Sequence, residues 1–185
     1  MKTDVTLLSK NPGKIAAASR VFSRYGIRVT GVDMEFPEIQ ADTSAEIARH
    51  TALEAYRTLQ TPVVREDHSF FLGDTGVPGP YMAYFDKRIK AEQLLSLLQT
   101  FNILDGHFEL AAAFVDDEGE LHEFRYEVPV VFENTMRGDE AQNWERLIRF
   151  PDDDRVFAEY AAEERGEVWE GNFIQIAELI TSRRA

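Results

Sequence analysis

The chain has 185 residues and a mass of 21.1 kDa, which suits one domain or one domain with a smaller lobe. Its 33 acidic residues outnumber 20 basic ones, and the resulting net charge of −13 argues against binding to nucleic acid or to anionic membranes. The sequence contains no cysteine, which excludes disulfides, thiol catalysis and thiolate metal sites. Because the N-terminus lacks a signal-peptide core and no apolar run reaches membrane-spanning length, we expect a cytoplasmic protein.

Hydrophobic periodicity and turn residues predict strands and helices that alternate through the first half of the chain. The expected strands are 4–8, 27–32, 62–64, 107–116 and 121–132, with a hairpin turn at 117–119. The expected helices run from the polar turn at 9–14 to about residue 24, then over about 44–59, 91–101, 155–164 and 172–182. Early strand–helix–strand units and a late hairpin favour an α/β fold with a mixed sheet flanked by helices.

The stretch 62–87 is the segment around which the other elements are expected to gather. Its short strand ends in Glu66 and Asp67, which places a carboxylate pair at the carboxyl edge of the sheet, where α/β proteins bind ligands. There the pair could hold a divalent cation or act as a general base, or it could only open a surface turn. The loop 76–81, rich in glycine and proline, has a stiff backbone that favours the functional interpretation. Phe70–Leu72 form either an exposed apolar face or a buried strand.

Five segments follow one another as they do in a known protein family. They are SKNPGK at 9–14, FPEIQ at 36–40, the helix segment 46–55, VRED at 64–67 and GVPGPY at 76–81. On these segments the chain resembles the inosine/xanthosine triphosphate pyrophosphatases, which hydrolyse deaminated purine nucleoside triphosphates to the monophosphate and pyrophosphate. The resemblance implies a single domain over residues 1–185, with two lobes and an active-site cleft between them. It also implies a nucleotide as the small-molecule partner, a homodimer, and Mg²⁺ as the cofactor.

The resemblance gives roles to the residues in the matched segments. Ser9, Asn11 and Lys14 would bind the triphosphate, with Lys14 also counted among the catalytic residues. Glu38 and Asp67 would lie near Mg²⁺. Asp67 would activate the attacking water, with Glu66 beside it as a second catalytic carboxylate, since a metal offsets phosphate charge and a carboxylate orients water.

Further roles rest on the second half of the chain. Trp144 lies where the family stacks the purine and Glu145 where the family has an aspartate, although as an isolated tryptophan Trp144 fits a core or interface position better. Lys87 is the first choice as a substitute for phosphate-binding cations of the family that this chain lacks, with an exposed solvated lysine as the alternative. Arg165 would keep one charge of the family's closing basic motif.

The departures from the family pattern leave alternative functions open. A helix lysine of the family is replaced by Thr51, an early acid is missing from the turn 16–18, and the closing S-H-R has no counterpart. The first hypothesis is an Mg²⁺-dependent nucleoside triphosphate pyrophosphatase. The second is a catalytically impaired relative that binds a nucleotide or a protein partner in the same cleft. The third is a hydrolase for a less charged substrate.

Overall fold

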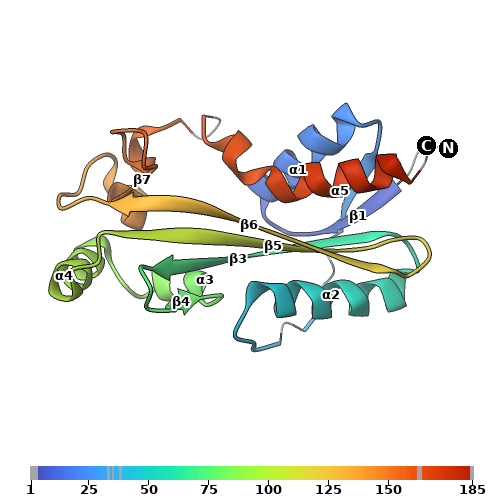
Figure 1. Ribbon diagram of the computed structural model, residues 1–185, viewed down its shortest axis with the longest axis horizontal. Helices are drawn as coiled ribbons and strands as arrows, with labels where there is room; N and C mark the ends of the chain where they lie inside the picture. Colours follow the sequence, from blue (N-terminus) through green and yellow to red (C-terminus); the bar gives the residue numbers. More distant parts are fainter. Residues whose placement is uncertain (1–3, 33, 35, 38, 162–163, 184–185) are drawn as a thin grey trace. The chain divides into compact units, whose positions relative to one another are not determined.

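The computed structural model describes residues 4–32, 34, 36–37, 39–161 and 164–183 (Figure 1). These residues form two compact units. Unit 1 comprises the chain up to Asp67 together with 110–126 and the segment from Gly166 onward, and unit 2 comprises 68–109 and 127–165. The described residues form a seven-stranded sheet in the order β2-β1-β3-β5-β6-β7, with β4 paired to β3. None of the described helices has the length and apolar character needed to cross a membrane.

The sheet is mixed, as the sequence predicted. β1 pairs in parallel with both β2 and β3, whereas β4 runs antiparallel to β3 and β7 antiparallel to β6. The strands are β1 (Asp4–Leu8), β2 (Arg28–Val32), β3 (Val63–Leu72), β4 (Pro78–Gly79), β5 (Asp105–Val115), β6 (Leu121–Phe132) and β7 (Ile148–Arg149). The α-helices are α1 (Pro12–Arg24), α2 (Ser44–Leu59), α3 (Met82–Asp86), α4 (Ala91–Phe101) and α5 (Gly171–Ser182). The 3₁₀ turns are η1 (Glu140–Arg146), η2 (Phe157–Glu159) and η3 (Gly166–Trp169).

Local side-chain chemistry fixes where the first two helices begin. The side-chain oxygen of Asn11 accepts hydrogen bonds from the backbone nitrogens of Gly13 and Lys14, at 2.8 and 3.3 Å, and so caps α1. Thr43 caps α2 by accepting from the backbone nitrogen of Glu46 at 3.2 Å. Because these signals lie within a few residues of each helix start, the sequence located both helices correctly.

Unit 1 has helices on both faces of its strands. In Figure 1, α1 and α5 cover one face of the sheet around β1, and α2 covers the opposite face. The first face is filled by fully buried side chains such as Phe22 and Phe173, whose ring centroids lie 6.0 Å apart. On β3, Val64 belongs to this cluster, whereas Val63 packs with the alanines of α2.

Two secondary-structure predictions were wrong. The strand expected at 62–64 continues to Leu72, so Glu66 and Asp67 lie inside β3 and not at an exposed strand end. The chain stays extended because the segment beyond the polar residues returns to a core: Phe70 and Leu72 are fully buried, as the buried-strand alternative predicted.

The helix expected over 155–164 is also absent from the described residues, which exclude 162–163. The segment instead forms the short turn η2, between extended residues at Val156 and Tyr160. A side chain here takes the place of a helical hydrogen-bond partner, because the Glu159 carboxylate accepts a hydrogen bond from the backbone nitrogen of Val156 at 2.9 Å.

Candidate functional site

A pocket of about 800 Å³ lies in unit 1 at the carboxyl ends of β1 and β2, whose last residues, Leu8 and Val32, contribute to its wall. This is the edge of a parallel sheet at which α/β proteins bind ligands. The described lining residues are Leu8, Ser9, Lys10, Asn11, Lys14, Val32, Met34, Phe36, Pro37, Thr51, Arg65 and Glu66. The volume lies within the range of small-molecule sites.

The charge of this pocket is opposite to that of the whole chain. Among the described lining residues, Lys10, Lys14 and Arg65 are cationic and Glu66 alone is acidic, whereas the chain as a whole carries a net charge of −13. The pocket also contains the N-terminus of α1, where the helix dipole and Asn11 favour a negatively charged group. Its electrostatics therefore suit an anionic ligand.

Glu66 is buried and engaged by two other elements of unit 1. The Lys14 ammonium donates to the Glu66 carbonyl oxygen at 3.1 Å and lies 3.8 Å from its carboxylate. The Asn172 side-chain nitrogen, from α5, donates to the other carboxylate oxygen at 3.1 Å. Because the Glu66 side chain is only 1% exposed, these contacts indicate a carboxylate that holds Lys14 in place.

Asp67 lies on the opposite face of β3 from Glu66. Side chains alternate along a strand, so Arg65 and Asp67 share the α2 face with Val63, whereas Glu66 shares the face of Val64. The Arg65 guanidinium lies 3.8 Å from the Asp67 carboxylate, and both side chains are partly exposed, by 17% and 21%. The two predicted catalytic carboxylates are thus separated by the strand that carries them, and Asp67 is the more accessible.

The structure brings together some of the predicted site residues. Ser9, Asn11, Lys14 and Glu66 line one pocket, and the Ser9 hydroxyl accepts a hydrogen bond from the Asn11 backbone nitrogen at 3.1 Å. Asp67 is joined to this group through Arg65. Glu38, which was assigned to the metal, lies outside the described residues.

Lys87, Trp144, Glu145 and Arg165 belong to unit 2. Trp144 is 5% exposed and its indole Nε1 donates to the Ile89 carbonyl oxygen at 2.9 Å, so this residue lies in the core of unit 2. Arg165 forms an ion pair with Glu145 at 2.8 Å, and Lys87 is exposed at the end of α3.

Sequence reasoning missed two residues that the structure places at this site, Arg65 and Asn172. Asn172 is spaced four and eight residues before Ile176 and Ile180, so it shares the apolar face of α5 with them. A polar amide on this face is the feature from which the sequence could have indicated Asn172. Arg65 gave no such signal, because the strand was expected to end before it.

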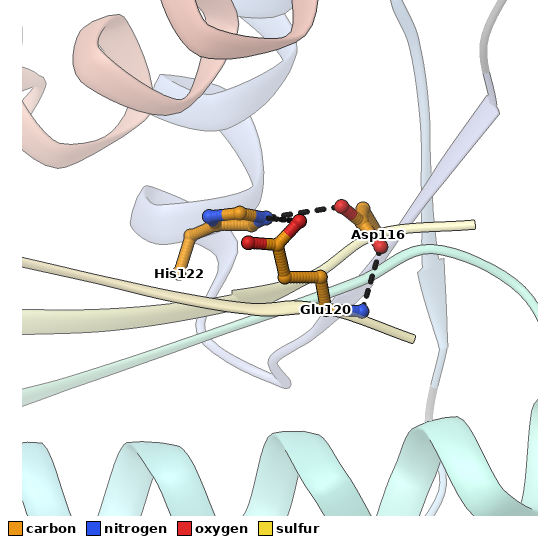
Figure 2. Close-up of side chains that lie close together, drawn as sticks. All are labelled: Asp116, Glu120 and His122. Carbon is orange, nitrogen blue, oxygen red and sulfur yellow. Dashed lines mark hydrogen bonds and ion pairs between the residues drawn. The ribbon is translucent and has the colours of Figure 1, made fainter. Parts of the chain in front are cut away.

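A second cluster of polar side chains lies at the turn between β5 and β6. Figure 2 shows Asp116, Glu120 and His122 pointing toward one another, with His122 Nε2 3.0 Å from an Asp116 carboxylate oxygen. Among the described residues this is the one group of three whose donor atoms could share a metal ion. However, the Arg183 guanidinium bonds to Asp116 and, at 2.9 Å, to Glu120. We therefore interpret the cluster as an ion-pair network that ties the end of α5 to the turn.

The fold and the pocket define an α/β protein with a mixed sheet and a cation-lined pocket at the carboxyl edge of its parallel strands. Comparison with known proteins narrows this class. The chain belongs to the Ham1 family, whose sequence profile matches residues 5–169. This confirms the family predicted from the five matched segments.

The relatives cover most of the chain. A dITP/XTP pyrophosphatase of Methanopyrus kandleri is 31% identical over 165 residues, which cover 89% of this chain and 88% of that protein. One from Thermococcus kodakarensis is 32% identical over 165 residues and covers 89% of each. The solved structure of a HAM1 protein from Coxiella burnetii, at 16% identity, superposes with a TM-score of 0.78 and covers 97% of this chain and 99% of that one.

Proposed function

We propose that this chain is a hydrolase that cleaves deaminated purine nucleoside triphosphates into the monophosphate and pyrophosphate. The single observation that carries the proposal is the cation-lined pocket at the sheet edge of a Ham1-family chain whose relatives are named dITP/XTP pyrophosphatases. The local positive charge in a chain of net charge −13 is the property that a triphosphate site requires.

In this proposal the triphosphate lies against the N-terminus of α1. Lys10 and Lys14 supply positive charge, and the polar turn of Ser9 and Asn11 keeps the helix start rigid through its hydrogen bonds. Charge-assisted contacts to phosphate contribute roughly 1.5 to 3 kcal/mol each. Glu66 acts indirectly, because its carboxylate and carbonyl oxygens position the Lys14 ammonium.

Asp67 is proposed as the general base. Its carboxylate would accept a proton from water, the water oxygen would attack the α-phosphorus, and the bond from that phosphorus to the bridging oxygen would break as pyrophosphate leaves. Asp67 suits this role better than Glu66 because its side chain is 21% exposed, whereas that of Glu66 is 1% exposed.

A magnesium ion fits the residues at this site. Mg²⁺ is commonly held by one or two carboxylates together with substrate phosphates and water, and Asp67 supplies a partly exposed carboxylate beside the pocket. When bound, the ion would neutralise phosphate charge and polarise the phosphoryl oxygens. Four further points stay predictions. They are the contribution of Glu38 to the metal, the binding of base and phosphates by Lys87, Trp144, Glu145 and Arg165, the homodimer, and the cytoplasmic location.

The test is pyrophosphate release from inosine, xanthosine and the four common triphosphates in the presence of Mg²⁺. We expect the deaminated purines to be hydrolysed fastest, and the Asp67→Asn variant to lose roughly 10²- to 10⁴-fold in kcat because a general base is removed. The exposed Asp152→Asn variant, with the same charge change in unit 2, should keep wild-type turnover.

Failure to release pyrophosphate from any of these triphosphates would overturn the proposal. If a nucleotide then still raised the melting temperature, the chain would be a binding protein that retains the pocket. The neutral Thr51 in the pocket wall is the observation that favours this second function.

A further inference from the structure

The start of α5 lies unusually close to β6, and this brings one of its side chains to β3. A Cβ atom at Gly171 would lie 2.8 Å from a ring carbon of Tyr126, so a larger residue would displace the helix start. The Tyr126 hydroxyl also donates to the Val168 carbonyl oxygen, which holds the segment before the helix against the same ring. The close approach places the Asn172 amide nitrogen 3.1 Å from the Glu66 carboxylate.

Asn172 occupies an apolar face of α5 at an energetic cost. The other buried residues of this helix are all hydrophobic: Phe173, Ile176, Ala177 and Ile180. Asn172 is fully buried, and its side-chain oxygen has no hydrogen-bond partner among the residues that the structure describes. A buried acceptor without a partner destabilises the folded state, and an apolar side chain of similar volume would avoid this cost. The feature that the amide supplies in return is its contact with Glu66.

The position of the Glu66 carboxylate determines how strongly it pairs with Lys14. One carboxylate oxygen accepts from Asn172, and the other lies 3.8 Å from the Lys14 ammonium, which is beyond hydrogen-bond distance. The ammonium donates to the Glu66 carbonyl oxygen at 3.1 Å. Without the hydrogen bond from Asn172, rotation of the carboxylate toward Lys14 would form a direct, charge-assisted pair between the two side chains.

We propose that Asn172 is a positioning residue, which restrains the Glu66 carboxylate and so keeps the Lys14 ammonium at the pocket wall. In variants without this restraint, Glu66 competes with a bound anion for Lys14. Asn172 is not among the described lining residues of the pocket, so it acts through Glu66 and not on the ligand. The inference rests on the proposed function insofar as the anion bound by Lys14 is the triphosphate of a nucleotide.

The first test measures the affinity of the full chain for inorganic tripolyphosphate by calorimetry. Asn172→Leu keeps the side-chain volume and removes the donor. It should weaken binding about three- to tenfold, because Lys14 must leave a direct pair with Glu66 before it binds the anion. Asn172→Ser, which keeps a hydroxyl donor, should weaken binding less. Gln175→Leu, the same type of change on the exposed side of α5, is the matched control and should change the affinity less than about twofold.

A double-mutant cycle distinguishes positioning from a purely structural role. If Asn172 acts through Lys14, Asn172→Leu should change the tripolyphosphate affinity by less than about twofold in the Lys14→Met background. A residue that only supports the fold would weaken binding by the same factor in both backgrounds. Equal losses in the two backgrounds, or wild-type affinity in folded Asn172→Leu, would overturn the proposal.

Hydrolysis assays separate this inference from the proposed function. In an active wild type, Asn172→Leu should raise KM by about the factor lost in tripolyphosphate affinity, and kcat should fall less than in Asp67→Asn. If the wild type hydrolyses no triphosphate and the cycle still shows coupling between Asn172 and Lys14, the inference stands and the function fails. If the wild type is active and the cycle shows no coupling, the function stands and the inference fails.

Thermal melts identify variants with a folding defect. If Asn172→Leu proves unfolded, Asn172→Ser takes its place in the cycle, with the same outcomes for and against the proposal. A wild-type chain that does not bind tripolyphosphate would also overturn the inference, because Lys14 would then hold no anion for Asn172 to influence.

Discussion

At the scale of single residues, the hydrogen bond from Asn172 to Glu66 joins α5 to β3 at the site. Asn172 is fully buried and donates to a carboxylate that is itself almost fully buried. Asn172→Ala should cost about 1–3 kcal/mol, because it removes a hydrogen bond to a buried carboxylate. Asn172→Asp should cost more, about 3–5 kcal/mol at pH 8, since it places two carboxylates together in a buried site.

Urea denaturation of the two variants at pH 8 and pH 5 provides the measurement. The Asn172→Asp variant should regain stability toward pH 5 as one of the two carboxyls takes up a proton, whereas Asn172→Ala should show no such recovery. Equal costs for the two substitutions at pH 8 would contradict the expected repulsion between two charged carboxylates at this site.

The sequence revealed those site residues that are fixed by their neighbours along the chain. Ser9, Asn11 and Lys14 were found because a polar turn and a helix start are local features, and the structure places them in one pocket. Arg65 was missed because its face of the sheet depends on the length of β3, which is set by pairing and packing far from residue 65. Asn172 was missed because its partner is 106 residues away.

At the scale of elements, the turn between β5 and β6 is joined to the end of α5 through Asp116. Burial raises the pKa of this carboxyl, but hydrogen bonds from His122 and from the backbone of Glu120 and Glu118 outweigh it and hold the pKa below its ordinary value. Because the pKa of Asp116 is lower in the folded state than in the unfolded state, the ionised carboxylate stabilises the fold, and this contribution is complete above the unfolded pKa. It is lost as pH falls through the folded pKa.

We therefore expect Asp116→Asn to cost about 1–3 kcal/mol at pH 7, where the carboxylate contacts are fully formed. The difference from wild type should shrink as pH falls from about 5 toward 3, near and below the ordinary carboxyl pKa. Chemical denaturation across this range measures both effects, and Asp117→Asn, an exposed neighbour in the same turn, is the control. A difference between Asp116→Asn and wild type that grows as the pH falls would contradict a lowered pKa of Asp116 in the folded state.

Elements with local start and stop signals were predicted well, and those that depend on distant partners were not. The helices α1, α2, α4 and α5 and the strands β1 and β2 follow from periodicity, caps and turns. The extension of β3 and the short turn η2 depend instead on aromatic packing within unit 2, where Phe70 stacks on Phe108 at 4.4 Å and Phe150 packs on Phe157 at 4.6 Å. Contacts of this kind cannot be read from a window of neighbouring residues.

At the scale of the whole molecule, the mixed sheet flanked by helices and the membership of the Ham1 family were predicted from the sequence and are confirmed. Family membership could be found because five short segments keep their order over nearly half of the chain. The single domain and the cleft between two lobes stay predictions, beside the observation that the described residues divide into two compact units.

Net charge is the property of the whole chain with the clearest consequence for stability. With 33 acidic and 20 basic residues, the folded state concentrates a charge of −13 in a smaller volume than the unfolded chain does, and this self-repulsion opposes folding. Monovalent salt screens it, since the Debye length falls to about 8 Å at 0.15 M. We expect NaCl to raise the melting temperature by about 2–4 °C, equivalent to roughly 1 kcal/mol for a chain of this size.

The shape of the salt dependence identifies its cause. Screening should produce most of the rise below about 0.3 M, where the Debye length shortens fastest, whereas exclusion of salt from the surface increases steadily into the molar range. Calorimetry in NaCl and in equal ionic strength of Na₂SO₄ separates the two, because screening depends only on ionic strength at these concentrations. A melting temperature that falls in dilute NaCl would show that favourable ion pairs, such as those of Glu170 with Arg20 and Arg24, outweigh the net repulsion.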